Sequence, residues 1–336
     1  MDGRTDGRID FVIAWVDGSD PEWRAQKARY APQDGAGRGA DGEARYRDWD
    51  LLRYWLRGAE RFAPWVGTIH FVTCGHLPAW LNTAHPKLHI VRHEDFIPAE
   101  YLPTFSSHTI ELNLHRIPGL AERFVYFNDD MFLTAPVRET DFFRRGLPCD
   151  AAILYPVHMV DNGIRAEIND LYVINRHFHK NDVIRKHPLK WLHPCYGRML
   201  ARTLCMMPFT RFSGFYVHHL PCAYLRRTFL EVWDAEGDAL GETCCHRFRD
   251  VRDVNQWVMQ YWQYASGRFM PRTPDIGTME EGQEGLLRLA GEIERQRYKM
   301  VCCNDSPEIA DFDGVKARLQ AAFARILPEP SAYELG

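Results

Sequence analysis

Two acidic turns, each placed directly after a short apolar run, carry the residue types best suited to chemistry. The first, residues 17–20 (DGSD), follows the run at 9–16, and the second, residues 128–130 (NDD), follows 123–127. Carboxylate and amide oxygens in such a turn suit a hard divalent cation, which can neutralise a diphosphate. The alternative for both turns is structural, because Asn and Asp side chains also satisfy the backbone donors of ordinary turns.

The glycine of the first turn adds a second kind of chemistry. A turn that contains Gly18 exposes backbone N–H groups, which can approach a phosphate or a uracil ring. The surrounding letters form neither a P-loop nor a GxGxxG fingerprint, so an ordinary turn stays open here as well.

His219 and a cluster of arginines offer proton transfer and phosphate binding. Histidine is the usual general acid or base near neutral pH, although a single histidine among 15 is more often structural. Arg247, Arg249 and Arg252 lie close to Asp253 in the sequence. Guanidinium groups bind phosphate in a bidentate manner, but pairing with acids on the surface is their commoner role.

Residues 298–305 add polar candidates behind a predicted helix. Lys299 could meet a phosphate, and Asn304 or Asp305 a metal ion. Capping of a following helix is the competing interpretation, since Asn and Asp favour that position. The adjacent cysteines at 244–245 and 302–303 raise the idea of zinc, but their spacing matches no zinc-finger pattern.

Apolar runs that alternate with amphipathic stretches predict the elements that hold these residues. Strands are expected at 9–16, 68–74, 88–91, 123–127 and 150–156. Helices are expected between Tyr46 and Pro64 and at 107–116, 224–233, 254–264, 279–298 and 315–326. This order is typical of an α/β fold, a mostly parallel sheet with flanking helices. Ligands bind beyond the carboxyl ends of strands in such sheets, and both acidic turns are predicted there.

Composition excludes several classes of protein. The chain has 336 residues, 46% of them hydrophobic and 26% charged, with a net charge of −4. These values exclude a disordered chain, a coiled coil and a small disulfide scaffold, and they give no sign of nucleic-acid binding. No apolar stretch approaches the roughly 20 residues of a membrane helix, and the N-terminus lacks the apolar core of a signal peptide.

The cysteines indicate the redox compartment, and two stretches of the chain lack a regular pattern. Nine cysteines without a CxxC motif indicate reduced thiols. We therefore expect a cytoplasmic protein, with peripheral association at the inner membrane left open. Residues 32–43 are expected to form a loop, and residues 187–221 show no assignable period.

Four sequence blocks, present in order across nearly the whole chain, resemble one known family. They are residues 9–20; 47–81 with 102–120 and 123–133; 219–227 with 246–254; and 298–306 with 326–334. Together they make the chain similar to the Stealth family of sugar-phosphate transferases, which usually has Asn at the position of Asp17. The resemblance implies one catalytic domain over 1–336 with a glycosyltransferase-A-like, Rossmann-like core. Residues 155–215 and 265–297 would be family-variable insertions that set acceptor choice or assembly.

The resemblance also implies roles for individual residues. Catalysis is expected from Asp130, His219, Arg249 and Asn304. A Mg²⁺ or Mn²⁺ ion is expected at Asp129, Asp130 and Asp305. The nucleotide-sugar is expected at Trp15, Val16, Asp17, Gly18, Asp20 and Lys299. Support of the site, rather than reaction, is expected from Ser107, Glu111 and Arg116.

The implied reaction moves a hexose 1-phosphate, with N-acetylhexosamine 1-phosphate as first candidate, from a UDP-sugar to a saccharide or polysaccharide hydroxyl. UMP leaves, and the phosphodiester enters a capsule or exopolysaccharide. His219 is the favoured base, with Asp130 as its rival or as a metal ligand. The alternatives are a metal-dependent glycosyltransferase that releases UDP, a hydrolase or nucleotidyltransferase acting on sugar nucleotides, and a non-catalytic sugar-nucleotide-binding module. The oligomeric state is left open.

Overall fold

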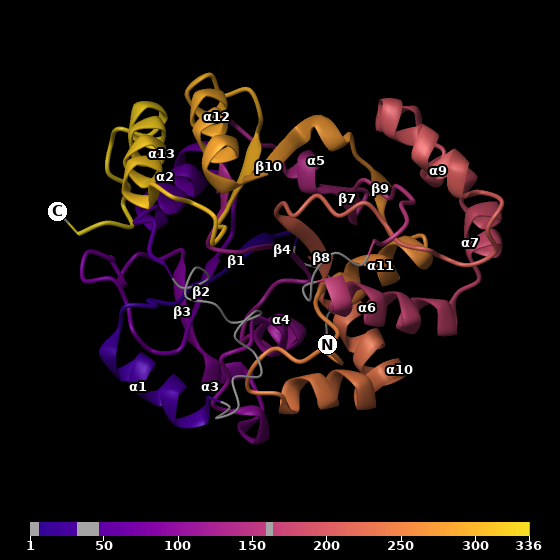
Figure 1. The fold of residues 1–336 in the computed structure, drawn as a ribbon, viewed down its shortest axis with the longest axis horizontal. Helices are drawn as coiled ribbons and strands as arrows, with labels where there is room; N and C mark the ends of the chain where they lie inside the picture. The colour runs from indigo at the N-terminus through magenta and orange to yellow at the C-terminus, as the bar shows by residue number, and fades with distance from the viewer. Residues whose placement is uncertain (1–6, 32–46, 159–163, 336) are drawn as a thin grey trace.

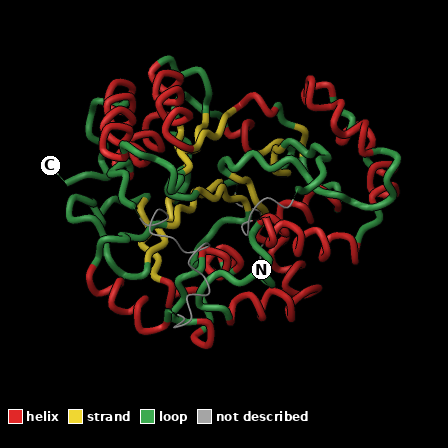
Figure 2. The backbone as a smooth tube through the Cα atoms, viewed as in Figure 1, coloured by secondary structure: helices red, strands yellow, loops and turns green. Residues whose placement is uncertain are grey.

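A central sheet runs through the molecule and helices cover it (Figure 1, Figure 2). The computed structural model describes residues 7–31, 47–158 and 164–335, so the loop expected at 32–43 lies outside the described residues. The sheet has five strands in the order β3-β2-β1-β4-β8. These strands are β1 (Ile9–Ala14), β2 (Ile69–Thr73), β3 (Leu88–Arg92), β4 (Arg123–Phe127) and β8 (Cys222–Leu225).

The strand order places a crossing point between β1 and β4. Strands β3, β2, β1 and β4 are parallel, and β8 is antiparallel to β4. The chain leaves β1 toward β2 and β3, then returns to the other side of β1 to form β4. Ligand sites of α/β sheets lie outside the carboxyl ends of the strands at such a reversal. The predicted α/β fold with a mostly parallel sheet is confirmed.

Two three-stranded sheets accompany the central sheet. One has the order β10 (Gly277–Glu281), β11 (Met300–Asn304), β5 (Met131–Leu133). The other has the order β6 (Phe143–Arg144), β7 (Leu147–Asp150), β9 (Met270–Pro271). Because β5 follows the second acidic turn and pairs antiparallel with β11, the end of β11 is brought beside that turn.

Helices of very different length complete the described chain. They are α1 (Pro21–Tyr30), α2 (Leu52–Phe62), α3 (His93–Phe96), α4 (Ser107–Leu112), α5 (Glu139–Phe142), α6 (Ile164–His177), α7 (Lys180–Lys186), α8 (Pro188–Trp191), α9 (Leu200–Met206), α10 (Arg226–Cys245), α11 (Trp257–Ala265), α12 (Gly282–Glu294) and α13 (Phe312–Ile326). Short 3₁₀ helices occur at η2 (Ala99–Tyr101), η3 (Leu114–Arg116), η4 (Pro194–Met199) and η5 (Pro274–Ile276). None of the helices in the described ranges combines the length and the apolar character that a bilayer crossing requires.

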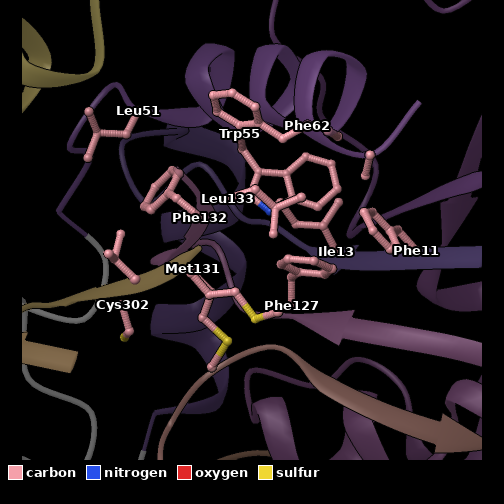
Figure 3. Packing of buried hydrophobic residues seen from close by; sticks show 14 of the residues in the cluster. Phe11, Ile13, Leu51, Trp55, Phe62, Phe127, Met131, Phe132, Leu133 and Cys302 are labelled. Atoms are coloured by element: carbon pink, nitrogen blue, oxygen red, sulfur yellow. The ribbon is translucent and has the colours of Figure 1, made fainter. Parts of the chain in front are cut away.

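The core lies on both faces of the central sheet. Alternate residues of β1 enter different apolar layers, Phe11 and Ile13 one layer and Val12 the other. Strand residues alternate in this way because successive side chains point to opposite faces. In the first layer, Trp55 of α2 packs edge-on against Phe127 at a ring-centroid distance of 5.2 Å (Figure 3). The continuous apolar run at 11–14 is thereby explained by burial on both sides of the sheet.

Several predicted elements are wrong in position or type. A strand was expected at 150–156, but the observed strand β7 stops at Asp150. Beyond β7, Leu154 forms an isolated bridge with Phe215. The first residues of the helices expected at 224–233 and 279–298 belong instead to the strands β8 and β10. Residues 302–304 belong to β11 rather than to a helix cap. Short apolar runs fit a strand and a buried helix equally well, and sheet pairing decided between them.

Candidate active site

The second acidic turn is fixed by bonds on both of its sides. The backbone N–H of Met131 donates to the carbonyl of Asn128 at 3.1 Å, which closes the turn between β4 and β5. The N–H of Cys303 in β11 donates to the carbonyl of Asp130 at 2.8 Å. Asn304, the next residue of β11, therefore lies beside the turn.

His219 reaches the same edge from β8. Because β8 runs antiparallel to β4, with Cys222 paired to Tyr126, its beginning lies at the carboxyl end of β4. The Nε2 atom of His219 lies 3.8 Å from Oδ2 of Asp130, and both side chains are half-buried. His219 has a positive φ of 44°, a strained conformation for a residue with a side chain, which persists where the surroundings enforce it.

The electrostatics of this pair favour the imidazolium form. Burial alone would lower the pKa of His219, but the nearby Asp130 carboxylate, with help from Glu111, outweighs burial and raises it. The other oxygen of that carboxylate, Oδ1 of Asp130, is buried without a hydrogen-bond partner among the described residues. A buried carboxylate oxygen with no donor is costly, so this atom is available to a cation, a proton or a substrate.

Helix α4 brings two polar side chains to the site. Ser107 and Glu111 are four residues apart and share a face of the helix. An N–H of Arg249 donates to Oγ of Ser107 at 2.7 Å, and the hydroxyl of Tyr126 in β4 donates to Oε1 of Glu111 at 3.2 Å. Burial raises the pKa of Glu111 to about 7, although Arg249 and Tyr126 act in the opposite direction.

The predicted arginine cluster divides into different roles. Arg249 enters the site, whereas Arg252 pairs with Asp250 at 2.8 Å and with Glu242 at 3.0 Å on the surface. The loop that carries them is anchored by Asp253, whose carboxylate contacts His108 and His246 at 2.9 and 2.7 Å. Arg247 donates to a backbone carbonyl at 2.7 Å and lies over the ring of Tyr30.

Two residues predicted for the site, Asn304 and Lys299, lie at opposite ends of β11. Asn304 donates to Glu281 at 2.9 Å at the end near the acidic turn. Lys299 precedes the other end and pairs with Asp141 at 2.7 Å. Five residues of extended chain span roughly 16 Å, so Lys299 is not brought to the Asp130–His219 pair. Asp305 accepts two bonds from the guanidinium of Arg47, one of them at 3.0 Å.

The first acidic turn uses its own side chains to hold its shape. Oδ1 of Asp17 accepts from the backbone N–H of Ser19 at 2.8 Å, and Oδ1 of Asp20 caps α1 by accepting from the N–H of Trp23 at 2.7 Å. The carbonyl of Gly18 accepts from Arg24 at 2.6 Å.

Trp15 and Val16 connect that turn to the sheet. The ring of Trp15 packs edge-on against His76 at 5.3 Å, and His76 accepts from the backbone N–H of Asp17 at 2.6 Å. Val16 is half-buried. Arg116, expected to support the site, lies instead over the ring of Trp233 at 5.1 Å, on the α10 side of the molecule.

Asp130 supplies the single oxygen ligand of a cluster, within the described residues, that could contribute to binding of a divalent cation. Ligand atoms of Asp130, His219 and Cys302 all lie within 4.8 Å of one another. Burial and the Asp130 charge raise the pKa of the Cys302 thiol well above its ordinary value, so this thiol stays neutral and offers little to such a cation. Desolvation and the charge of Asp130 raise the pKa of Asp129. Since Asp129 keeps contact with solvent, crowding by the like charge matters more than desolvation there. Both carboxylates would gain from a cation.

Sequence reasoning missed three contributors to this site. Tyr126 lies in the middle of β4, where a tyrosine in an apolar run gives no sign of its partner Glu111. Cys302 drew attention only as part of a cysteine pair. Trp257, whose ring meets His219 edge-on at 6.2 Å, begins α11 and gave no local signal. All three depend on contacts between distant parts of the chain.

Solved glycosyltransferase structures resemble the protein at a low level. The galactosyltransferase LgtC, in complex with donor and acceptor sugar analogues, is 10% identical, covers 96% of this chain and 98% of its own, and has a TM-score of 0.40. The bifunctional glycosyltransferase WbbM is also 10% identical, covers 97% of this chain and 53% of its own, and has a TM-score of 0.41.

Sequence relatives are much closer. The capsular polysaccharide phosphotransferase WcwK of Streptococcus pneumoniae is 40% identical over 330 residues, 97% of this chain and 98% of the relative. The exopolysaccharide phosphotransferase cps2G of Lactiplantibacillus plantarum is 36% identical over 97% of this chain and 96% of the relative. Conserved regions 1 and 2 of the Stealth proteins, CR1 and CR2, match residues 7–35 and 45–149. The chain therefore belongs to the Stealth family of phosphotransferase enzymes, as its motifs predicted.

Proposed function

We propose that the protein transfers a sugar 1-phosphate from a UDP-sugar to a saccharide hydroxyl during synthesis of a capsule or exopolysaccharide, and that UMP leaves. The observation that carries the proposal is the Asp130–His219 pair, 3.8 Å apart at the carboxyl end of β4. The names of the relatives as capsular and exopolysaccharide phosphotransferases agree with this chemistry. An N-acetylhexosamine remains the first candidate for the sugar.

The bond changes follow from attack on phosphorus. The acceptor oxygen forms a bond to the phosphorus that carries the sugar, and the bond from that phosphorus to the oxygen of UMP breaks. The acceptor proton passes to the ring of His219, and the carboxylate of Asp130 stabilises the imidazolium that forms. Phosphoryl transfer depends mainly on positioning and on neutralisation of charge, which the other residues provide.

Arg249 supplies the fixed positive charge. Its guanidinium is held by Ser107 and faces the buried carboxyl of Glu111, so it is oriented before a diphosphate arrives. Asn304 lies beside the acidic turn and orients a phosphate oxygen. Asp129 and Asp130 would hold Mg²⁺ or Mn²⁺, which when bound supplies further neutralisation of the diphosphate.

The first acidic turn is the proposed nucleotide site. The carboxylates of Asp17 and Asp20 and the N–H groups of Asp17 and Ser19 are already engaged, so the N–H of Gly18 and the ring of Trp15 are the groups proposed to meet the nucleotide. The turn ends β1, which is the strand next to β4, and this strand order supports a nucleotide site close to Asp130. Lys299 has no part in this proposal because it pairs with Asp141 at the far end of β11.

The products test the proposal. The protein would be incubated with UDP-N-acetylglucosamine, Mg²⁺ and a polysaccharide acceptor, UMP and UDP would be separated by chromatography, and a phosphodiester would be sought by phosphorus NMR. We expect UMP together with the phosphodiester. UDP would place the attack on the anomeric carbon and refute the mechanism, and UMP without a phosphodiester would indicate hydrolysis.

A matched pair of variants links the products to the site. His219→Gln removes the ring that faces Asp130, whereas His218→Gln changes the neighbouring histidine, which lies outside this pair. We expect the first variant to lose UMP formation by about 10²-fold or more and the second to retain it. Equal activity of the two variants would refute the role given to His219.

A further inference from the structure

Residues 180–211 differ in charge from the rest of the molecule. This segment, which contains α7, α8, η4 and α9, lies at one edge of the structure (Figure 1). It contains the single acid Asp182 and the bases Lys180, Arg185, Lys186, Lys190, Arg198, Arg202 and Arg211. The whole chain has 41 bases and 45 acids, so a basic segment stands out against an otherwise acidic protein.

Large aromatic residues fix this segment to the body of the protein. Trp191 and Tyr196 are fully buried. The ring of Trp191 packs against Phe269 at 5.8 Å and against Phe215 at 6.1 Å. The segment is therefore a folded part of the molecule with a defined inner side.

One buried lysine ties the first and last helices of the segment together. The ammonium group of Lys180, in α7, donates to the carbonyls of Met206 and Met207 at 2.8 and 3.0 Å. These carbonyls lie at the end of α9, where a positive charge is favourable. Helices α7 and α9 consequently form one structural unit.

Residues 180–211 also expose large apolar side chains to solvent. Leu189, Leu204 and Phe209 are 82%, 53% and 56% exposed. In α9, Ala201, Leu204 and Cys205 are exposed beside the base Arg202, while Thr203 is buried, so the face of this helix turned to solvent combines apolar side chains with a positive charge. Soluble helices normally turn their apolar side chains inward, and exposed apolar groups of this kind indicate a partner.

We propose that residues 180–211 form a docking surface for an anionic membrane. Exposed bases, among them Arg185, Lys186 and Arg198, lie in the same short segment as the exposed apolar side chains. Apolar side chains that enter the headgroup region and bases that bind anionic lipids act together at membrane surfaces. Charge complementarity favours anionic lipid as the occupant, because the segment carries seven bases and one acid beside its exposed apolar side chains.

Vesicle sedimentation tests the surface directly. The full chain would be mixed with vesicles of phosphatidylglycerol and phosphatidylethanolamine, or of phosphatidylcholine alone. We expect apparent binding at least about tenfold tighter to the anionic vesicles, with strong weakening by added salt. Absence of binding, or equal binding to both kinds of vesicle, would overturn the proposal.

Matched variants locate the contact. The triple variant Leu189→Ser, Leu204→Ser, Phe209→Ser removes the exposed apolar groups of the segment. The control Leu230→Ser, Leu287→Ser removes side chains that are 50% and 41% exposed on α10 and α12. We expect the triple variant to bind anionic vesicles about tenfold or more weakly and the control to bind like the wild type. Equal loss in both variants would overturn the assignment to this segment.

A second variant guards against misfolding, and a second measurement tests the rival occupant. Arg185→Ser, Lys186→Ser, Arg198→Ser changes only exposed side chains and is expected to weaken anionic-vesicle binding about tenfold. Light scattering would detect a dimer, and a dimer abolished by the triple variant would identify a second copy as the occupant and overturn the proposal. None of these assays uses a sugar nucleotide, so their outcome is independent of the proposed function.

Discussion

The two acidic turns follow neighbouring parallel strands, β1 and β4, yet their carboxylates are in opposite states. In the first turn, Asp17 and Asp20 each accept a backbone N–H, at 2.8 and 2.7 Å. In the second turn, Oδ1 of Asp130 is buried with no partner among the described residues, and Oδ2 faces His219. The first turn is held by its acids, whereas the second is held by backbone bonds to β11 that leave its acids free for other partners.

The hydrogen-bond partners of a carboxylate distinguish a structural acid from a reactive one. A carboxylate whose oxygens accept hydrogen bonds stabilises the local fold, and its removal leaves unsatisfied donors. A carboxylate that is crowded and lacks donors destabilises the protein in the absence of a ligand. Substitution in the second turn should therefore harm activity far more than stability, and substitution in the first turn should do the reverse.

The largest effect is expected for Asp130→Asn. The amide cannot stabilise the His219 imidazolium or bind a cation as the carboxylate does, so kcat/KM should fall by about 10³-fold. The free energy of unfolding should change little, because removal of the buried, unpartnered Oδ1 charge offsets the lost attraction between Oδ2 and His219. Steady-state kinetics and urea unfolding of the same preparation measure both. A large loss of stability with a modest loss of activity would contradict the distinction drawn between the two turns.

Arg249 is expected to give the next largest effect. Arg249→Ala should lower kcat/KM by about 10²-fold or more, and Arg249→Lys by about tenfold, because lysine keeps the charge but not the planar fork. The matched control is Arg252→Ala, since Arg252 is tied to Asp250 and Glu242 on the surface and should retain turnover. If Arg252→Ala is as harmful as Arg249→Ala, the division of the arginine cluster is wrong.

Glu111 should make stability depend on pH. Its pKa is raised from 4.5 to about 7 by burial, so the folded protein holds a proton that the unfolded chain has already lost in this window. The free energy of unfolding should consequently fall as pH rises from 4.5 to 7, by about 3 kcal/mol from this group. Glu111→Gln lacks this loss, so its stability relative to wild type should increase with pH across the window.

Urea unfolding between pH 4 and 8 measures that difference, with Glu100→Gln as the control. Glu100 is an exposed glutamate in the nearby turn η2. A constant difference between wild type and Glu111→Gln over the whole range would contradict a raised pKa at Glu111.

The smallest effects belong to the first turn. Asp20→Ala removes the cap of α1 and should cost about 1 kcal/mol of stability with little change in kcat. Asp17→Asn should be nearly neutral, since an amide oxygen can accept the same bonds from Ser19. Thermal unfolding and kinetics of both variants measure this. Loss of turnover in Asp20→Ala without loss of stability would move this acid into the reactive group.

The local pattern predicted much of the sheet and helix inventory. The strand at 123–127 was predicted with the bounds of β4, and the apolar stripe before Pro64 gave α2. The stripe of α2 is long enough to indicate a helix, whereas the short run at 123–127 is rich in aromatic and β-branched residues and is followed by a turn, which favours a strand. The strands β8 and β11 were missed, because they are short and their pairing with β4 and β5 involves residues about one hundred or more positions away.

For the candidate site, too, local motifs identified single residues but not which of them lie together. Sequence motifs singled out Asp130, His219 and Arg249 one by one. The structure brings these three together with Ser107 and Glu111. It separates Lys299 and Arg116 from them, since each has a partner elsewhere. Spacing along a chain cannot distinguish the near end of β11 from its far end, because which end meets the acidic turn depends on strand direction.

The family, the α/β class and the acidic turns at strand ends could be predicted from the amino-acid sequence, because motifs and periodicity involve neighbouring residues. Which carboxylates accept hydrogen bonds and which lack donors depends on the tertiary contacts. Tertiary contacts join distant residues such as Arg249 and Ser107, which are 142 positions apart. Contacts of this length arise from the strand order and from burial on both faces of the sheet, neither of which is a local property.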